Sequence, residues 1–446
     1  MSVSTLNFLA QEYVDLTIAK EKHEKSTDVY WYTPQPYWKR ESMDFSRNEK
    51  TLMEPLMDKK SEGRTLKDIL DESEFLISCL ELYKKTAKPE EIDRVNYLIV
   101  HTISLRTRVL ILMGDNISYD DMTNNCYNLI APVYDYSRFD EILKELDDTL
   151  PGSGSLSDRV LDFKRKILVP RDKLPRTLTA VTQEFHNFAV NNMDVSKDNM
   201  PRLGFKNLNG LPFLTIFYGY CYDRFEYFRY LGLDYPYTVD KIMEVIGHEM
   251  EPGHLTYFEM RLKTFIDTSY PEMSVIAQHA PSSAFSEGSA RRSVYMCFDN
   301  SMDKLIEFEK DVIFDLGGLD KGLCKYMPVW HKFMDISNYG KLEVERNIWN
   351  GVWSKDKAGK FMERYLIAEP GKGAEMLDHF PEDDGHFVCH DYARDIVGEY
   401  FSSVAESTEE QWKLYHKLCK SHMSMRGIKD KTYEVVLSDN DAFLIE

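Results

Sequence analysis

Two histidines that lie six residues apart, His248 and His254, enclose a proline and a glycine in the segment His-Glu-Met-Glu-Pro-Gly-His. On a regular helix, six residues turn the chain by about 600° and advance it by about 9 Å, so the two imidazoles would point about 120° apart. Pro252 cannot donate a hydrogen bond to the carbonyl of His248, and its ring clashes with that carbonyl. Gly253 permits backbone angles that other residues avoid. The sequence therefore predicts a kink or helix break over Glu251 to Gly253 that returns His254 toward His248.

A histidine directly followed by a glutamate is how zinc peptidases supply a metal ligand and a general base in one short motif. Catalytic zinc needs about three protein ligands and one open position, and a nearby carboxylate takes the proton of the activated water. Glu249 is the preferred base, and Glu251 is the alternative. The other interpretation is a helix that ends at Pro-Gly and carries two histidines by chance. We expect His248 and His254 to bind a divalent metal, zinc first, with Fe²⁺ or Mn²⁺ as alternatives.

A third metal ligand must come from another part of the chain. Glu287, in the segment Ser-Ala-Phe-Ser-Glu-Gly, is the strongest candidate because it is a lone carboxylate among small residues, 33 positions after His254. The alternative interpretation is an ordinary exposed glutamate at the start of a helix. His279, which lies between the two segments, is a second candidate ligand.

Most of the sequence has the pattern of helices, and strand-like alternation is scarce. Apolar residues recur three or four positions apart over residues 69–83, 92–103 and 158–188, which is the period of a helix with one buried face. A further helix is expected to open at Ser137, with Asp140 completing a variant capping box. Residues 432–437 are the segment that most resembles a short strand. We therefore expect a mainly α, large helical protein with a metal site in a cleft between helices.

The segment Pro-Gly-Ser-Gly-Ser at residues 151–155 is the clearest interruption of the helical pattern. It predicts a flexible break between an N-terminal helical lobe, residues 1–150, and a helical catalytic region, residues 156–446. Its glycines could in principle hold a phosphate. Because no strand precedes them and no Gly-Lys-Ser/Thr follows, the linker interpretation is preferred.

Residues 217–237 are rich in aromatic side chains and end shortly before the histidine motif. Aromatic residues mostly serve burial, so core packing is the preferred interpretation. The alternative is the wall of a pocket that leads into the motif.

The net charge of the chain restricts its partners. It is −19 over 446 residues, and a protein this acidic repels nucleic-acid backbones and anionic membranes. We find no run of about 18 apolar residues, so no transmembrane helix is expected. The seven cysteines are scattered without a CxxC pair, which is typical of free thiols in a reducing compartment. We therefore expect a cytoplasmic protein with no nucleic-acid or membrane partner.

Together, the HExxPGH segment and the downstream Phe-Ser-Glu-Gly segment at residues 285–288 resemble the domain of unknown function 885 family of bacterial and archaeal metallopeptidase-like proteins. Arg364-Tyr365 followed by Pro370-Gly371 and Ala374 is similar to a later motif of that family, as are Tyr392 and Gly398. The resemblance spans residues 165–401 in patches. It implies a helical fold grouped with zinc peptidases that use a glutamate as third ligand, a gluzincin-like arrangement.

Carried over by motif, the resemblance implicates His248, His254 and Glu287 as metal ligands and Glu249 as the base. This chain departs from the family pattern around the motif. The family commonly has a second histidine where Leu255 stands, a glutamine near Thr256 and Tyr257, and a tryptophan where Ser289 stands. These departures leave the expected ligands intact and change the surroundings of the substrate.

Hydrolysis at a metal also needs a group that stabilises the developing oxyanion. Tyr392 and His390 are the candidates for this catalytic role, and the resemblance points mainly to Tyr392. His386 and Arg394 belong to the same late polar cluster and are candidates for substrate binding. The alternative is a polar network on a helix surface.

Two consecutive arginines, Arg291 and Arg292, follow Glu287 by four and five positions. An arginine there could hold a carboxylate of the substrate through two parallel hydrogen bonds. It could equally pair with a neighbouring acid or point into solvent.

The leading functional hypothesis is a metal-dependent hydrolase of an amide or peptide bond, acting on a peptide or a small amide-containing substrate. Two histidines and one carboxylate are also the ligand set of non-haem iron enzymes. A non-hydrolytic metalloenzyme that acts on a small metabolite in a biosynthetic pathway is therefore the first alternative. The second is a catalytically inactive helical interaction protein in which the motif is only a kinked helix.

Overall fold

The computed structural model describes residues 5–24, 29–31, 63–207, 215–221, 226–380 and 384–431. Over these ranges the chain is mainly helical, as the spacing of its apolar residues predicts. It divides into two compact units. Unit 1 comprises residues 1–130, 257–286 and 414–441, and unit 2 comprises residues 131–256, 287–413 and 442–446. The glycine-rich segment 151–155 lies inside unit 2, and the predicted strand at 432–437 lies outside the described residues.

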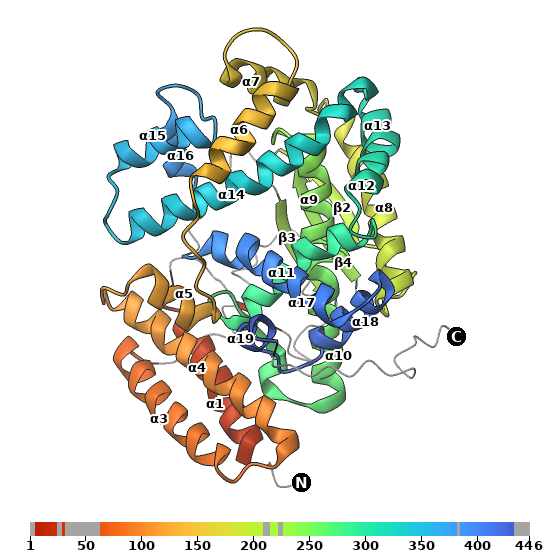
Figure 1. Ribbon diagram of the computed structural model, residues 1–446. Coiled ribbons are helices and arrows are strands. Elements are labelled where there is room, and N and C mark those ends of the chain that lie inside the picture. The colour runs from red at the N-terminus through yellow and green to blue at the C-terminus, as the bar shows by residue number, and fades with distance from the viewer. Residues whose placement is uncertain are drawn as a thin grey trace. The chain divides into compact units, whose positions relative to one another are not determined.

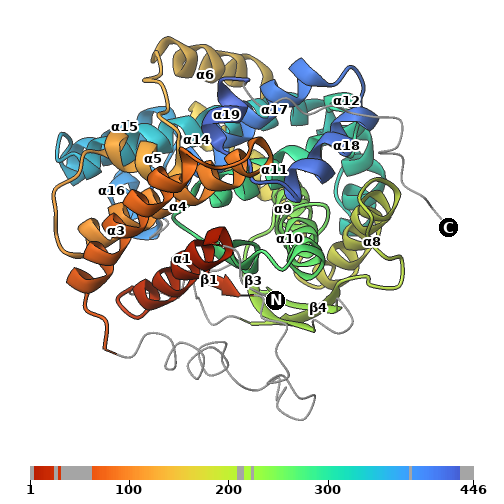
Figure 2. The same cartoon turned by 90° about the horizontal axis from the view of Figure 1, so that it is seen from below.

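Unit 1 is built on three helices that pack side by side, α1 (Thr5–Glu21), α3 (Leu66–Lys84) and α4 (Ile92–Leu112) (Figures 1 and 2). Their facing apolar side chains, among them Leu80 and Val95, form one buried core. The helix α5 (Tyr119–Tyr127) packs against α4, and a two-stranded sheet pairs β1 (Val29–Trp31) antiparallel with β5 (Val275–Ala277). The helices predicted over 69–83 and 92–103 are confirmed. A short helix, α19 (Met425–Lys429), also belongs to this unit.

The segment from Pro89 to Leu112 is long and apolar enough to cross a membrane by length and composition, with a mean hydropathy of 1.2 over 18 residues. This differs from the expectation that no such segment exists. In the structure 56% of that window is buried. The ring of His101 bonds the Tyr97 carbonyl and the Ser282 amide. Because a core helix can have the same composition, α4 alone is weak support for a membrane span.

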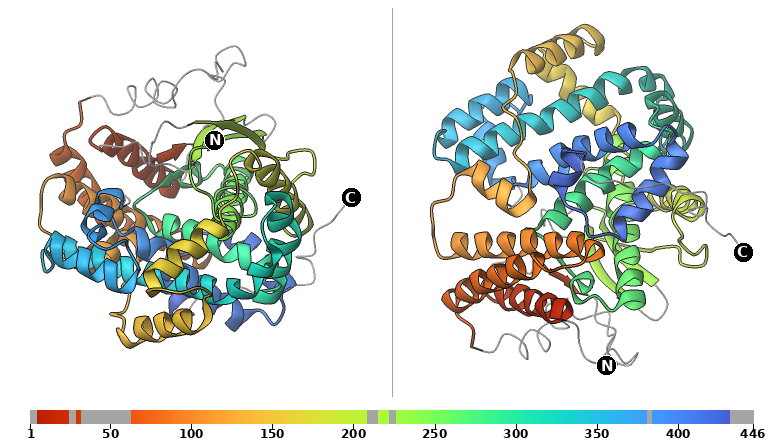
Figure 3. Two further views of the ribbon diagram at one scale, coloured as in Figure 1. Left: turned by 90° about the horizontal axis from the view of Figure 1, so that it is seen from above. Right: turned by 60° about the horizontal axis from the view of Figure 1, so that its bottom comes forward.

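Unit 2 contains the longest helix of the described chain, α14 (Met327–Trp349), with α6 (Ser137–Thr149) and α15 (Lys355–Tyr365) packed against it. Figure 3 shows these three helices side by side. The other helices that lie wholly in this unit are α7 (Leu156–Lys166), α8 (Leu174–Asn192), α9 (Val239–Glu249), α12 (Met302–Phe308), α13 (Asp315–Gly317), α16 (Gly373–Met376) and α17 (Ala393–Val404). Three helices contain residues of both units, α10 (His254–Thr268), α11 (Pro281–Met296) and α18 (Thr408–Cys419).

A three-stranded sheet in unit 2 precedes α9, in the order β2 (Arg202–Lys206), β4 (Glu226–Gly232), β3 (Thr215–Cys221). Strand β2 runs parallel to β4, and β3 runs antiparallel to it. Much of the aromatic run at residues 217–237 therefore forms strands, which suits the preference of aromatic residues for sheets. The helical periodicity of the sequence gave no sign of this sheet.

The structure confirms that α6 begins at Ser137 but corrects its predicted cap. Tyr136, rather than Ser137, is the N-cap of α6, and no side chain caps it. The backbone N–H of Ser137 instead donates to Asp135, so the expected capping box with Asp140 is wrong. A reciprocal capping box does form at the end of the glycine-rich segment, where Ser155 and Asp158 open α7.

Candidate metal centre

The predicted helix break between the two motif histidines is confirmed. Helix α9 ends at Glu249 and α10 begins at His254, and the Glu251–Pro252 peptide bond between them is cis. A Cβ atom at Gly253 would lie 2.0 Å from the carbonyl oxygen of His248. The chain can therefore turn back on His248 only because residue 253 has no side chain.

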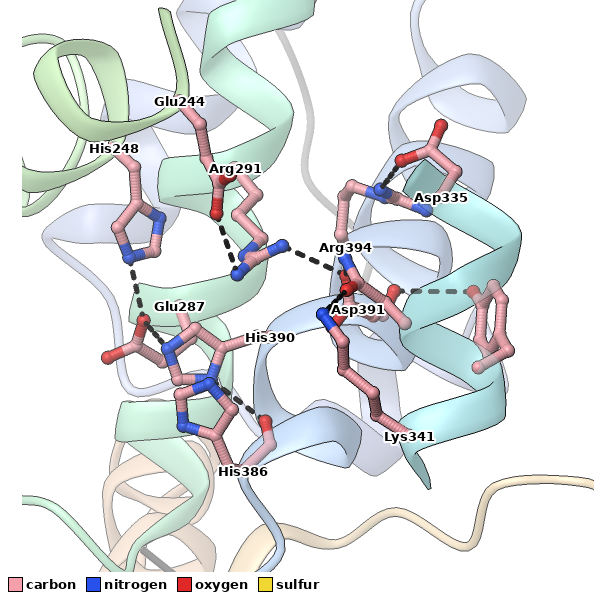
Figure 4. Close-up of polar contacts among 12 residues, drawn as sticks. Glu244, His248, Glu287, Arg291, Asp335, Lys341, His386, His390, Asp391 and Arg394 are labelled. Carbon is pink, nitrogen blue, oxygen red and sulfur yellow. Dashed lines mark hydrogen bonds and ion pairs between the residues drawn. The ribbon is translucent and has the colours of Figure 1, made fainter. Parts of the chain in front are cut away.

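This turn brings the two imidazoles together on one carboxylate. The Nε2 atoms of His248 and His254 are 3.2 Å apart, and they lie 3.1 Å and 3.0 Å from Oε2 of Glu287 on α11. The ligand atoms of these three residues all lie within 4.8 Å of one another. Figure 4 shows the Glu287 carboxylate turned toward His248. All three residues belong to unit 2, and the sequence singled out each of them.

The separations suit ligands that share one ion. Ligand atoms about 2.0–2.1 Å from a tetrahedral zinc are separated from one another by roughly 3.3 Å. Two imidazole nitrogens and a carboxylate oxygen at the observed distances can share a proton or a cation. Nδ1 of His248 is buried and has no hydrogen-bond partner in the described part of the chain, so no neighbour there fixes which nitrogen carries the proton. The three residues fit a divalent metal.

The ionisation states of two ligands also suit a metal. Burial and the neighbouring His254 lower the pKa of His248 to about 4, so its imidazole is neutral at pH 7 and has a lone pair to offer. Burial alone would raise the pKa of Glu287. The imidazoles of His254 and His390 outweigh burial and hold the pKa of that carboxyl well below its usual range. Neutral imidazole and ionised carboxylate are the forms that bind metals.

A third imidazole, that of His390, reaches the same carboxylate oxygen. Its Nε2 atom lies 2.8 Å from Oε2 of Glu287, and its Nδ1 atom donates to the carbonyl of His386 at 2.8 Å. The two histidine rings stack, with their centroids 3.8 Å apart (Figure 4). Burial would lower the pKa of His390, but Glu287 outweighs burial and raises it. Both ring nitrogens of His390 face acceptor oxygens, so the geometry suits a ring that carries both protons.

His390 lies in a short π-helical segment, η7 (Val388–Tyr392). Such segments interrupt α-helices by one residue and are frequent at functional sites. Here the irregular turn directs two consecutive side chains into the site. His390 contacts Glu287, and Asp391 accepts a hydrogen bond from Arg291.

The two candidate bases have different surroundings. Glu249 receives a hydrogen bond from Arg229 of β4 at 2.6 Å, and the same arginine donates to the Glu249 carbonyl at 2.6 Å. Burial would raise the pKa of Glu249, but Arg229 and the two motif histidines outweigh burial and lower it to about 2. Glu251 instead is 3% exposed and lies 2.5 Å from Nδ1 of His186. Glu251 therefore forms a buried pair with His186 of α8.

The expected substrate-binding arginines are engaged by carboxylates. Arg291 bridges Glu244, at 3.1 Å, and Asp391, at 2.9 Å. Arg394 pairs with Asp335 and Asp395 at 2.6 Å and 2.9 Å (Figure 4). The structure therefore favours the alternative in which Arg291 pairs with neighbouring acids, and Arg394 shares that environment.

Arg292 differs from its neighbour. Its side chain packs against α17, where its Nε lies 3.2 Å from the place of a Cβ on Gly398. Burial lowers its pKa. Its substrate-binding role stays a prediction.

A cavity of about 530 Å³ lies beside the metal triad within unit 2. Three of its lining residues stand one helical turn from site residues. Glu244 precedes His248 on α9, Arg291 follows Glu287 on α11, and His386 precedes His390. Residues four apart on a helix lie on the same face, so the cavity is next to the triad along all three segments.

Two further candidates lie away from the triad contacts. His279 belongs to unit 1, where its ring centroid is 6.5 Å from that of Tyr127, and it is not one of the three ligand residues. Tyr392 is buried at the end of η7. Its catalytic role stays a prediction.

The pocket-wall interpretation of the aromatic run can be examined at its end. Tyr235 lines the cavity and Tyr237 is fully buried. The side chains of residues 217–228 lie outside those that the structure describes. Tyr235 therefore supports the pocket-wall interpretation, and Tyr237 supports the core-packing interpretation.

Sequence reasoning missed several residues that complete the site. Glu244 and Asp391 lie near motif residues, at four positions before His248 and directly after His390, so their spacing was a usable signal. The sequence carries no such signal for Arg229 and Lys341, because they reach the site from a strand and a helix that are remote from the motif in sequence.

No protein family matches the chain, and no curated protein matches its sequence. Among solved structures, the putative lipoprotein from Colwellia psychrerythraea is similar with a TM-score of 0.49 and 12% sequence identity, over 82% of this chain and 69% of that one. The resemblance to the domain of unknown function 885 family thus stays a prediction.

Proposed function

We propose that the protein is a metal-dependent hydrolase of an amide or peptide bond, with zinc as the expected ion. The observation that carries the proposal is the convergence of His248, His254 and Glu287 beside a cavity large enough for a small molecule. Cavities of about 300–1,000 Å³ are typical of small-molecule sites. The ligand set and the adjacent Glu249 suit the gluzincin-like arrangement that the family resemblance implies.

A bound zinc ion would lower the pKa of water and polarise a carbonyl group. The chain supplies the groups that act around it. Glu249, directly after a ligand, would hold the proton taken from water and pass it to the leaving nitrogen. His390 donates its Nε2 proton to Glu287, which fixes the orientation of that ligand. To stabilise a developing oxyanion as well, His390 would have to share its Nε2 proton between Glu287 and that oxygen, because Nδ1 is used by the His386 carbonyl.

One observation favours the alternative of a non-hydrolytic metalloenzyme. The ion pair with Arg229 holds the pKa of Glu249 at about 2, which is far below the value that suits a general base at neutral pH. Two histidines and one carboxylate also bind Fe²⁺ in enzymes that act on small metabolites.

Metal analysis of the protein purified without added metal tests the two functions. The hydrolase predicts zinc with amide hydrolysis that does not depend on oxygen. Bound iron together with oxygen-dependent turnover would instead support the non-hydrolytic metalloenzyme. Absence of any bound metal, and no gain in thermal stability on adding zinc, would leave a helical interaction protein.

Glu249→Gln tests the assignment of the base. The variant keeps all three ligands and should retain the metal while it loses nearly all turnover. Retained turnover would remove Glu249 from the mechanism.

A further inference from the structure

Cations line the cavity beside the triad, and most of them are held by carboxylates. Lys241 and Arg291 share Glu244, and Arg291 also pairs with Asp391. On the rest of the wall, the cations pair as His331 with Glu309 and Arg394 with Asp335 and Asp395. These cations have their charge matched inside the protein.

Lys341, on α14, differs from the other cations of the cavity wall. Among the described residues its ammonium has one hydrogen-bond partner, the neutral side-chain oxygen of Asn338, at 2.9 Å. An ammonium group carries three donors, so two remain for a ligand. Asn338 is itself oriented by a hydrogen bond to Asp391 at 2.9 Å. Figure 4 shows the Lys341 side chain extended from α14 toward Asp391.

Lys341 stands next to a series of ion pairs that does not include it. In the linked series Lys241, Glu244, Arg291 and Asp391, two cations balance two carboxylates. Lys341 adjoins this balanced series without an ion-pair partner of its own in the described chain. Burial, the largest influence, lowers the pKa of Lys341 to about 8 because it disfavours the charged amine, although the nearby Asp391 carboxylate acts to raise it.

Lys341 is also well placed relative to the proposed reaction. It lines the same cavity as Glu244, Arg291 and His386, each of which stands one helical turn from a triad residue or from His390. A molecule that fills a cavity of about 530 Å³ could thus extend from Lys341 toward the triad.

We propose that the cavity binds an anionic group of the substrate, a carboxylate or a phosphate, on the Lys341 ammonium. The inference deepens the proposed function, because it makes the substrate a small acid whose scissile amide lies toward the triad. Asn338 positions the ammonium and offers no competing charge. The carboxylate is the form we favour, because Lys341 presents a single ammonium and the nearby arginines are already paired.

The binding test uses acetate and inorganic phosphate as probes and needs neither metal nor substrate. Crystals of the metal-free full chain soaked in each probe should show an anion within hydrogen-bond distance of Lys341 Nζ. In solution the bound anion should raise the melting temperature, and the rise should grow with the logarithm of its concentration above the dissociation constant. Acetate alone would identify a carboxylate site, and phosphate alone would identify a phosphate site. Absence of both anions from Lys341 would overturn the proposal.

Two variants make the test specific. Lys341→Met should abolish the anion-dependent stabilisation, and Lys341→Arg should preserve part of it. Lys332→Met, on the same helix but exposed and paired with Glu145, is the matched control and should behave like the wild type. Equal anion effects in Lys341→Met and the wild type would contradict the assignment.

Once a peptide that the protein hydrolyses is known, the KM of its hydrolysis provides a second test. Lys341→Met should raise KM by roughly tenfold to a hundredfold for the acid and leave KM unchanged for its C-terminal amide, since a hydrogen bond to a charged group contributes about 1.5–3 kcal/mol. Equal effects on both peptides would contradict it. The metal content measured in parallel separates this failure from that of the proposed function, because anion binding at Lys341 does not require the metal.

Discussion

His390 and Glu287 are joined by a 2.8 Å contact between Nε2 and the carboxylate oxygen that also faces both motif histidines. A group that orients a ligand in this way commonly changes metal affinity by about 10–100-fold when it is removed. We therefore expect His390→Ala to weaken zinc binding by about that factor, measured by competition with a chromogenic chelator.

His386→Ala is the matched control for this prediction. The contact of His390 Nδ1 uses the backbone carbonyl of residue 386, which the substitution keeps. The variant loses the ring stacking with His390 but keeps the bond to its Nδ1, and it should lose much less affinity. Equal zinc affinity in His390→Ala and the wild type would show that Glu287 needs no such support.

Gly253 should be irreplaceable in a way that other glycines are not. Its missing side chain leaves the space in which the carbonyl oxygen of His248 lies, 2.0 Å from the place of a Cβ. Gly253→Ala must displace backbone, at a cost of about 1–3 kcal/mol, and move His254 away from Glu287. We expect lower unfolding free energy and loss of zinc binding, measured by urea unfolding and metal titration.

Gly317→Ala serves as the control, since the nearest atom to its Cβ would be a leucine side-chain carbon at 3.3 Å. That neighbour can move by a few tenths of an ångström. A Gly253→Ala variant that binds zinc as tightly as this control would contradict the role given to the turn.

The centre of the site could be predicted from sequence because its geometry is local. Pro252 and Gly253 encode the break that joins His248 to His254, and both act within one turn of chain. Glu287 was found because its segment carries a recognisable pattern. The contacts that tune these residues come from partners remote in sequence, such as Arg229 from β4 and Arg291 with Asp391. No periodicity of the sequence predicts which charged side chains from distant segments will form ion pairs.

The fold shows the same limit. Helices with one apolar face were predictable because a period of 3.6 residues is visible in a short window. The sheet of β2, β3 and β4 was not, because its aromatic residues also fit a helical core and the partners in β2 and β4 are 26 positions apart, as in Arg202 and Phe228. The division into units was hidden for a related reason. Residues 257–286 and 414–441 belong to unit 1 because of their packing. The local composition of these segments does not predict that assignment.

The two neighbouring glutamates of the motif should separate cleanly by function. Glu251 is buried against His186, so Glu251→Gln should lower the unfolding free energy by about 1–3 kcal/mol and keep zinc. Glu249 is partly exposed beside the triad, so Glu249→Gln should keep most stability and lose turnover. Urea unfolding and hydrolysis rates of both variants check this. If Glu251→Gln loses turnover without loss of stability, the roles are reversed.

Unit 1 should depend on pH through a buried carboxylate. Glu272 is fully buried, receives two hydrogen bonds from Arg94, at 2.5 Å and 2.9 Å, and lies 2.9 Å from His422. Burial would raise its pKa, but His422 and Arg94 outweigh burial and lower it to about 2. A depressed carboxyl pKa stabilises the folded state fully above the ordinary value of 4.5, and this contribution is lost as the pH falls toward 2.

This shift corresponds to roughly 3 kcal/mol of stability lost between pH 5 and pH 2. We expect Glu272→Gln to be less stable than the wild type at pH 7 and to lose less stability on acidification, measured by amide hydrogen exchange in α4. Glu74→Gln removes an exposed ion pair with Arg106 in the same unit, and it should follow the wild-type curve because such pairs contribute little. Parallel curves for the wild type and Glu272→Gln would show that the acid sensitivity of unit 1 arises from other groups.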